Sequence, residues 1–184
     1  MNVDRAPVLV GRSFGFWWLL ASIVAWVPGS IMIDVVGPVV GEGWFYSAGL
    51  IVSGISIGGM QWLVLRRQVS WAGWWVLANI AGWTVGALLN LPLGLFVGFA
   101  VGLAAAGVMQ WLVLRRQLSR ATWWLLASFV AWAAGQVISG LAFPVGQAPC
   151  SGAVFGAVIG AITGIALAWL LRHPALPGGE AEEA

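Results

Sequence analysis

The chain has 184 residues, of which 61% are hydrophobic and only 8% are charged, whereas a soluble domain carries roughly 25% charged residues. Its formal net charge of +2 comes from eight cations, all of them arginine, and six acids. So few charges cannot cover a water-exposed surface, and the single cysteine, Cys150, cannot form an intramolecular disulfide. The composition therefore excludes a soluble globule, a disordered chain, a disulfide scaffold and a nucleic-acid-binding protein, and it indicates an integral membrane protein.

Six apolar segments are long enough to span a membrane, which requires about 20 residues. Residues 68–114 are uncharged over 47 positions, which is room for two helices, and Pro92 and Gly94 predict the break at 90–94. Residues 121–171 hold two more spans, with the break at 143–149. The expected spans lie near 13–35, 44–66, 71–91, 93–115, 122–143 and 151–172.

All the arginines fall on one side of this six-span topology. They are Arg5 and Arg12, Arg66 and Arg67, Arg115, Arg116 and Arg120, and Arg172. Because basic residues are retained in cytoplasmic loops, we expect a multi-pass protein of a bacterial inner (plasma) membrane with both termini in the cytoplasm. The pairs Arg66-Arg67 and Arg115-Arg116 act as topology signals and can also contact anionic lipid headgroups. Residues 174–184 are expected to form a short acidic cytoplasmic tail.

The chain repeats one hairpin three times. The block QWLVLRRQ at 61–68 recurs at 110–117, and the WWxLA block at 74–78 recurs at 123–127, both 49 residues later. An earlier copy of the second block begins at Trp17. We therefore expect an all-α integral membrane protein with one six-helix domain over 1–173. Its three tandem helical hairpins, 13–66, 71–116 and 122–172, would form a pseudo-threefold repeat.

The first helix of each hairpin carries tryptophans and small polar residues on one face. Trp26 lies about 12 Å deeper than Trp18 at 1.5 Å per residue, which is too deep for interfacial anchoring. The predicted contacts for pigment, lipid or a partner are Trp26, Trp83 and Trp132 together with Ser22, Asn79 and Ser128. Packing and hydrogen bonding between helices are the alternative interpretation of this face.

The second helices carry small residues at every fourth position. Two series stand out, one in the fourth span and one in the sixth: Gly94, Gly98 and Gly102, and Gly152, Gly156, Gly160 and Gly164. Small residues at this spacing let helix backbones approach closely, because lipid supplies no hydrophobic force between helices. We predict that these glycines are helix-packing positions.

The sequence contains few side chains that could act as a nucleophile, a general acid or base, or a metal ligand. The sequence has one histidine, His173, no lysine and no cluster of cysteine and histidine for a metal. Gln61 and Gln110 lie one turn inside the arginines and favour hydrogen bonding across helices. We therefore expect no enzyme, no catalytic residue and no metal site. The cofactors left open are lipid, carotenoid, quinone, or (bacterio)chlorophyll held through a partner.

The blocks QWLVLRR and WWxLAS/N resemble uncharacterised Gly- and Trp-rich multi-pass repeat membrane proteins of phototrophic and related bacteria, over about residues 11–173. The resemblance implies no catalytic or ligand-binding residue. We expect a non-enzymatic accessory or assembly subunit of a larger membrane complex, and the resemblance makes a photosynthetic reaction-centre or light-harvesting complex the specific candidate. The alternatives are a small channel or carrier for a small solute and a self-contained lipid- or carotenoid-binding protein.

Overall fold

The described backbone consists of helices joined by short turns, and helices are the structure that lipid favours because they satisfy their own N–H and C=O groups. The computed structural model describes residues 12–40, 43–142 and 148–173. Its elements are α1 (Arg12–Ile31), η1 (Met32–Val36), α2 (Gly37–Val40), α3 (Trp44–Leu65), α4 (Ala72–Leu93), α5 (Leu95–Leu114), α6 (Thr122–Ala142) and α7 (Ala148–Arg172). Among these, six helices are long and apolar enough to cross a membrane. The protein is a multi-pass membrane protein, and the six predicted spans coincide with these helices.

The helix boundaries follow local signals in the sequence. Gly94, at φ +86°, separates α4 from α5 and donates a 2.8 Å backbone hydrogen bond to the carbonyl of Asn90. This confirms the predicted break at 90–94. Helix α1 ends at Ile31, within the predicted span 13–35, and the helical backbone continues through the π-helical segment η1 into α2, which ends at Val40. The predicted break at 143–149 falls largely outside the described residues, as do Arg5, the side chain of Arg12 and the predicted tail at 174–184.

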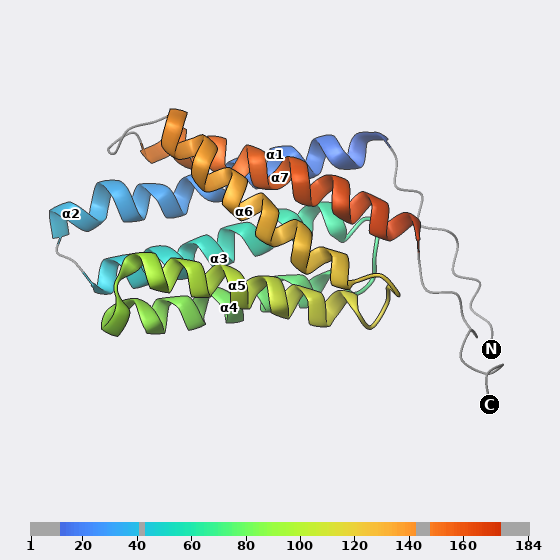
Figure 1. The fold of residues 1–184 in the computed structure, drawn as a ribbon, viewed down its shortest axis with the longest axis horizontal. Coiled ribbons are helices and arrows are strands. Elements are labelled where there is room, and N and C mark those ends of the chain that lie inside the picture. Colours follow the sequence, from blue (N-terminus) through green and yellow to red (C-terminus); the bar gives the residue numbers. More distant parts are fainter. Residues whose placement is uncertain (1–11, 41–42, 143–147, 174–184) are drawn as a thin grey trace.

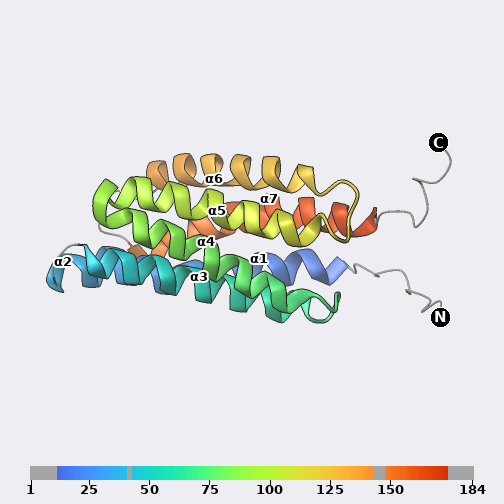
Figure 2. The ribbon, with the colours of Figure 1, turned by 90° about the horizontal axis from the view of Figure 1, so that it is seen from below.

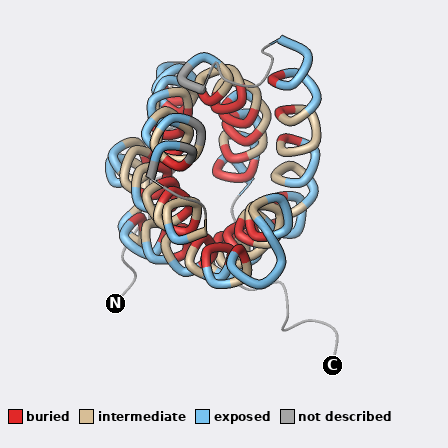
Figure 3. Tube along the Cα trace, turned by 90° about the vertical axis from the view of Figure 1, so that its left-hand side faces the viewer, coloured by how far each residue is buried: buried red, intermediate tan, exposed pale blue. Residues whose placement is uncertain are grey.

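The six long helices run side by side (Figures 1 and 2) and form a ring when seen end-on (Figure 3). The order around the ring is α1, α3, α4, α5, α6 and α7, and α7 packs against α1 to join the two ends of the chain. Helices α3, α5 and α7 all finish at arginines, so one end of the ring is called the arginine end and the other the outer end. Five neighbouring pairs pack closely, whereas α5 and α6 make few contacts. We call this loose junction the α5–α6 seam.

The seam has a local cause in the sequence of α5. Helix α3 presents Gly54 and Gly58 to α4, where an added Cβ would lie 2.7 and 3.0 Å from α4 side chains. The residues 49 positions further on are Leu103 and Gly107. A Cβ at Gly107 would find only Ser128, 3.8 Å away. Because a leucine replaces the first glycine, α6 does not approach α5 as closely as α4 approaches α3.

Candidate ligand cavity and its tryptophan seal

Three tryptophans converge inside the ring at the arginine end. Trp18, Trp75 and Trp124 are at most 2% exposed. The ring centroids of Trp18 and Trp75 are 5.9 Å apart and those of Trp75 and Trp124 are 5.2 Å apart, in the edge-to-face geometry that aromatic pairs favour. The same buried cluster includes Leu65, Leu114 and Leu167. We call these six residues the tryptophan seal, because they fill the interior of the ring at this end.

The indole N–H groups of the seal donate to polar side chains of the glycine-rich helices. The three pairs are Trp75–Gln61 (2.8 Å), Trp124–Gln110 (3.1 Å) and Trp18–Thr163 (3.1 Å). The first two bonds confirm the interpretation of Gln61 and Gln110 as residues that bond across helices. Each bond joins helices from two different hairpins, and the third joins the last helix to the first. Such bonds stabilise helix association in lipid.

Thr163 is a site residue that the sequence patterns did not single out. When the sequences of α3 and α7 are aligned on their final arginines, Arg66 and Arg172, the residue of α7 that corresponds to Gln61 is Leu167. Helix α7 continues one turn further before its arginine, so Thr163 takes this position instead. A signal was present in the glycine spacing, because each acceptor lies three residues after a glycine: Gly58 and Gln61, Gly107 and Gln110, Gly160 and Thr163.

The predicted small polar residues lie one turn deeper than the seal. The Oδ1 atom of Asn79 accepts a 3.1 Å hydrogen bond from Nε2 of Gln110, and its Nδ2 donates to the carbonyl of Trp75 at 2.9 Å. The buried hydroxyls of Ser22 and Ser128 have no hydrogen-bond partner in the described structure. Asn79 and Ser128 line a chamber of about 50 Å³, large enough for a water molecule.

The deeper tryptophans form an aromatic cluster below this chamber. Trp26 and Trp83 are 5% and 1% exposed, and their ring centroids are 5.6 Å apart. Phe155 lies 4.6 Å from Trp26, and Phe99 lies 5.4 Å from Trp83. Trp132 lies on the loosely packed helix α6 and is half-buried. The structure therefore brings Trp26 and Trp83 into ring contact, and Trp132 packs against the edge of the same cluster. The indole N–H groups of Trp26 and Trp132 are buried and have no partner among the described atoms.

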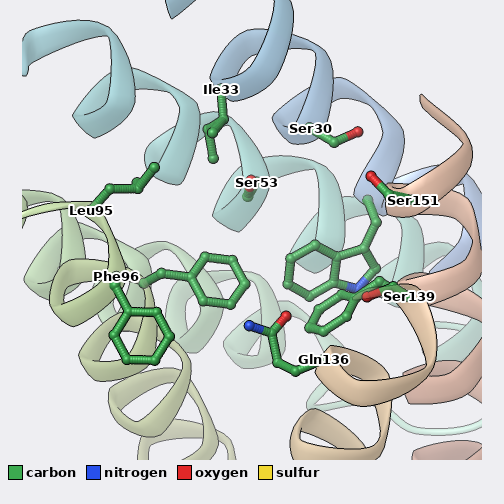
Figure 4. A pocket seen from close by; sticks show the side chains of 12 residues that line it. Ser30, Ile33, Ser53, Leu95, Phe96, Gln136, Ser139 and Ser151 are labelled. Carbon is green, nitrogen blue, oxygen red and sulfur yellow. The ribbon is translucent and has the colours of Figure 1, made fainter. Parts of the chain in front are cut away.

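A cavity of about 460 Å³ lies between this aromatic cluster and the outer end, and we call it the outer cavity (Figure 4). Its volume falls within the roughly 300–1,000 Å³ that is usual for small-molecule sites. Its lining includes four aromatic residues, Trp26, Phe96, Phe99 and Phe155, and five polar ones, Ser30, Ser53, Gln136, Ser139 and Ser151. Both α5 and α6 contribute side chains, which places the cavity at the α5–α6 seam. None of the described residues that line it is charged.

The polar side chains of the outer cavity fall into two kinds. The hydroxyls of Ser30, Ser53 and Ser139 each donate to a carbonyl of their own helix, at 2.9, 2.9 and 2.7 Å. The amide of Gln136 has no hydrogen bond within the described residues, and Figure 4 shows it pointing into the cavity. Gln136 was not predicted as a site residue, although its sequence signal is clear: an amide in the outer half of an uncharged span.

Six of the seven predicted packing glycines lie at close helix contacts. Gly98 and Gly102 face α4, whereas the other four face α1: Gly152, Gly156, Gly160 and Gly164. An added Cβ at Gly156 would lie 2.6 Å from the backbone oxygen of Ser22. Gly94 requires a correction. It has open space around its α-carbon and a φ of +86°, so it serves the turn between α4 and α5 and not helix packing.

The predicted arginine pairs are exposed at the arginine end: Arg66 and Arg67, Arg115 and Arg116. The guanidinium of Arg66 lies 4.8 Å from the ring centroid of Trp62, and that of Arg115 lies 4.9 Å from Trp111. These are cation–π contacts between residues one turn apart. Arg67 also lies in the wall of a surface groove of about 610 Å³ between α1 and α3. An arginine beside an apolar groove suits a phospholipid.

No group of three or more metal-ligating side chains occurs among the described residues. No protein-family model, curated protein or solved structure matches the chain. The class of protein therefore rests on the fold, which is that of a multi-pass membrane protein with six candidate transmembrane helices.

Proposed function

We propose that this protein is a non-enzymatic accessory or assembly subunit of a larger membrane complex. The observation that carries the proposal is the poor burial of α6 within its own ring. Only 17% of its span is buried, against 33–50% for the other five candidate spans. Helices in lipid are stabilised by close packing against other helices, and α6 has a close neighbour only in α7. The free side of α6 is therefore the surface that we assign to a partner helix.

The free side of α6 has a continuous apolar stripe. Leu126, Val130, Val137 and Leu141 are 52%, 47%, 60% and 83% exposed. At 100° per residue these four side chains fall within about 60° of one another around the helix. We call them the α6 stripe. Branched side chains arranged in this way match the groove of a second membrane helix.

The proposal includes an orientation and a repeat. The collection of arginines at one end of the ring supports a cytoplasmic location of both termini in a bacterial inner membrane. The three Trp–polar bonds between hairpins support a pseudo-threefold arrangement of one hairpin. The resemblance of the WW and QWLVLRR blocks to proteins of phototrophic bacteria makes a photosynthetic reaction-centre or light-harvesting complex the specific candidate partner.

The tryptophan seal weighs against the alternative of a channel or carrier. A solute path along the ring axis would have to pass the buried side chains of Trp18, Trp75 and Trp124 at the arginine end, where Trp75 contacts each of the other two. We therefore prefer the accessory subunit.

The experiment is gentle isolation of the tagged protein from native membranes, with its particle mass and absorption spectrum recorded together. We expect a large assembly, and we expect the triple variant Val130→Ala/Val137→Ala/Leu141→Ala to leave it. The matched control is Leu77→Ala/Leu88→Ala/Ile165→Ala, which shortens side chains that are 56%, 67% and 73% exposed on α4 and α7. This control should remain bound. Migration of the unaltered protein only as a free monomer or small homo-oligomer contradicts the proposal, and a large but colourless assembly contradicts its photosynthetic part.

A further inference from the structure

We propose that the outer cavity binds the ring of a membrane-soluble quinone, a flat uncharged head with carbonyl oxygens and an apolar tail. The cavity is formed entirely by side chains of this chain, from α1, η1, α3, α5, α6 and α7. The inference therefore goes beyond the proposed function and does not depend on a partner complex.

The shape of the wall favours a flat ring. The rings of Trp26 and Phe155 meet at 85° with centroids 4.6 Å apart, and those of Phe99 and Phe155 meet at 58° with centroids 6.0 Å apart. Phe96, at the cavity wall on α5, is 70% exposed. A planar conjugated head can pack against such faces and edges over its whole area. The described lining residues carry no charge, which favours an uncharged ligand.

The unused hydrogen-bond donors define the polar part of the ligand. The indole N–H of Trp26 is buried and has no partner among the described residues. Gln136 is only partly buried, lines the cavity, and its amide makes no hydrogen bond with another described residue. The hydroxyls of Ser30, Ser53 and Ser139 already donate to their own helices. A ligand that carries an acceptor would satisfy the Trp26 donor, and a buried donor without an acceptor is destabilised. The two free donors lie on α1 and α6, on different walls, so a ligand with two carbonyl groups can satisfy both.

The α5–α6 seam supplies the route of entry. Quinones partition into the apolar part of the membrane, and the seam exposes the side of the ring to lipid where α5 and α6 diverge. The tryptophan seal closes the other end of the interior. The head can therefore enter from the lipid and lodge against the aromatic cluster while its tail remains in the seam.

The test is equilibrium binding of decylubiquinone, a short-tailed quinone, to the purified protein in lipid nanodiscs. We expect saturable binding at one site. Gln136→Leu and Trp26→Phe, which each remove a donor and keep an apolar side chain, should weaken binding about five- to tenfold, as loss of one neutral hydrogen bond does. The matched controls are Gln117→Leu, near the arginine end, and Trp17→Phe, on the lipid-facing surface. These should bind as the unaltered protein does.

Three results would overturn the inference. The first is no saturable binding by the unaltered protein in its folded form. The second is equal binding of decylbenzene, which has the ring and tail without carbonyls. The third is native protein that carries bound carotenoid or phospholipid in the cavity and releases no quinone. Gln136→Leu should keep its place in the large assembly, because Gln136 is not part of the α6 stripe, so failure of this inference is separable from failure of the proposed function.

Discussion

The indole N–H of Trp124 on α6 donates a 3.1 Å hydrogen bond to Oε1 of Gln110 on α5. These two helices make the fewest contacts of any neighbouring pair in the ring, so a single polar pair links them near the arginine end. The same Gln110 amide donates through Nε2 to Asn79 on α4. One side chain therefore ties α4, α5 and α6 together where the glycine packing between α5 and α6 is weakest.

Replacement of Gln110 by leucine should destabilise the protein by about 1–3 kcal/mol, because it leaves buried polar groups of both Trp124 and Asn79 without a partner. Gln61→Leu should cost less, since only the Trp75 indole loses its acceptor. Reversible unfolding in bicelles measures both. Gln117→Leu, in the loop after α5, serves as the control and should leave the free energy of unfolding unchanged. Equal effects of Gln61→Leu and Gln110→Leu would contradict the double role of Gln110.

Gly82 and Gly86 of α4, which face the backbone of α5, should tolerate no side chain. An added Cβ at Gly86 would overlap the carbonyl oxygen of Gly98 and lie 2.6 Å from the α-carbon of Gly102. Gly86→Ala should therefore force α4 and α5 apart and lower the midpoint of thermal unfolding. Gly59→Ala is the matched control, because nothing lies within 4 Å of its added Cβ, and alanine favours a helix by about 1 kcal/mol over glycine. A thermal midpoint unchanged by Gly86→Ala would show that this contact is not tight.

Proteoliposomes of the unaltered protein should be impermeable to ions and small neutral solutes. The physical reason is the tryptophan seal, in which Trp75 contacts both Trp18 and Trp124 across the interior. Flux assays with empty vesicles and gramicidin-containing vesicles as the two limits measure this directly. Flux clearly above that of empty vesicles would favour the channel and count against the seal.

The single cysteine gives a direct test of orientation. Cys150 is exposed near the start of α7, at the outer end of the ring. In intact cells with a permeabilised outer membrane, a membrane-impermeant maleimide should label Cys150. The companion variant Arg120→Cys/Cys150→Ser moves the thiol to the exposed loop at the arginine end and should be labelled only after lysis. The reverse pattern would place the termini outside the cytoplasm.

The positions of the six long helices could be predicted from the sequence, because the length of each uncharged apolar segment and the charges at its ends determine where a membrane helix lies. Uncharged segments bounded by arginine, proline and glycine predicted all six long helices and the turn at Gly94. The packing was only partly predictable. Periodicity places glycines on one face of a helix but does not say which helix lies opposite, and so Gly82 and Gly86, which face the backbone of α5, were not recognised as packing positions.

The candidate site was harder to predict, because a cavity depends on how far two helices diverge. The repeat suggested that Trp26, Trp83 and Trp132 would behave alike. Trp132 lies at the edge of the cluster that contains Trp26 and Trp83 and is less buried than they are. It lies on α6, which makes few contacts with α5, where Leu103 stands in place of the glycine of the previous repeat. Gln136 has no counterpart in the repeated blocks, and repeat patterns do not reveal a residue that occurs once.

The contact between α1 and α7 has a consequence for how the chain is made. Trp18 is in α1, yet its hydrogen-bond acceptor, Thr163, is in α7, 145 residues later. The ring can therefore close only after α7 has been synthesised, and until then the inner faces of the earlier helices have no packing partner on that side. Because the ring is closed by this contact, the fold does not require the hairpins to occur in their present order along the chain. A permuted chain that begins at α4 and links α7 to α1 would give every helix the same neighbours.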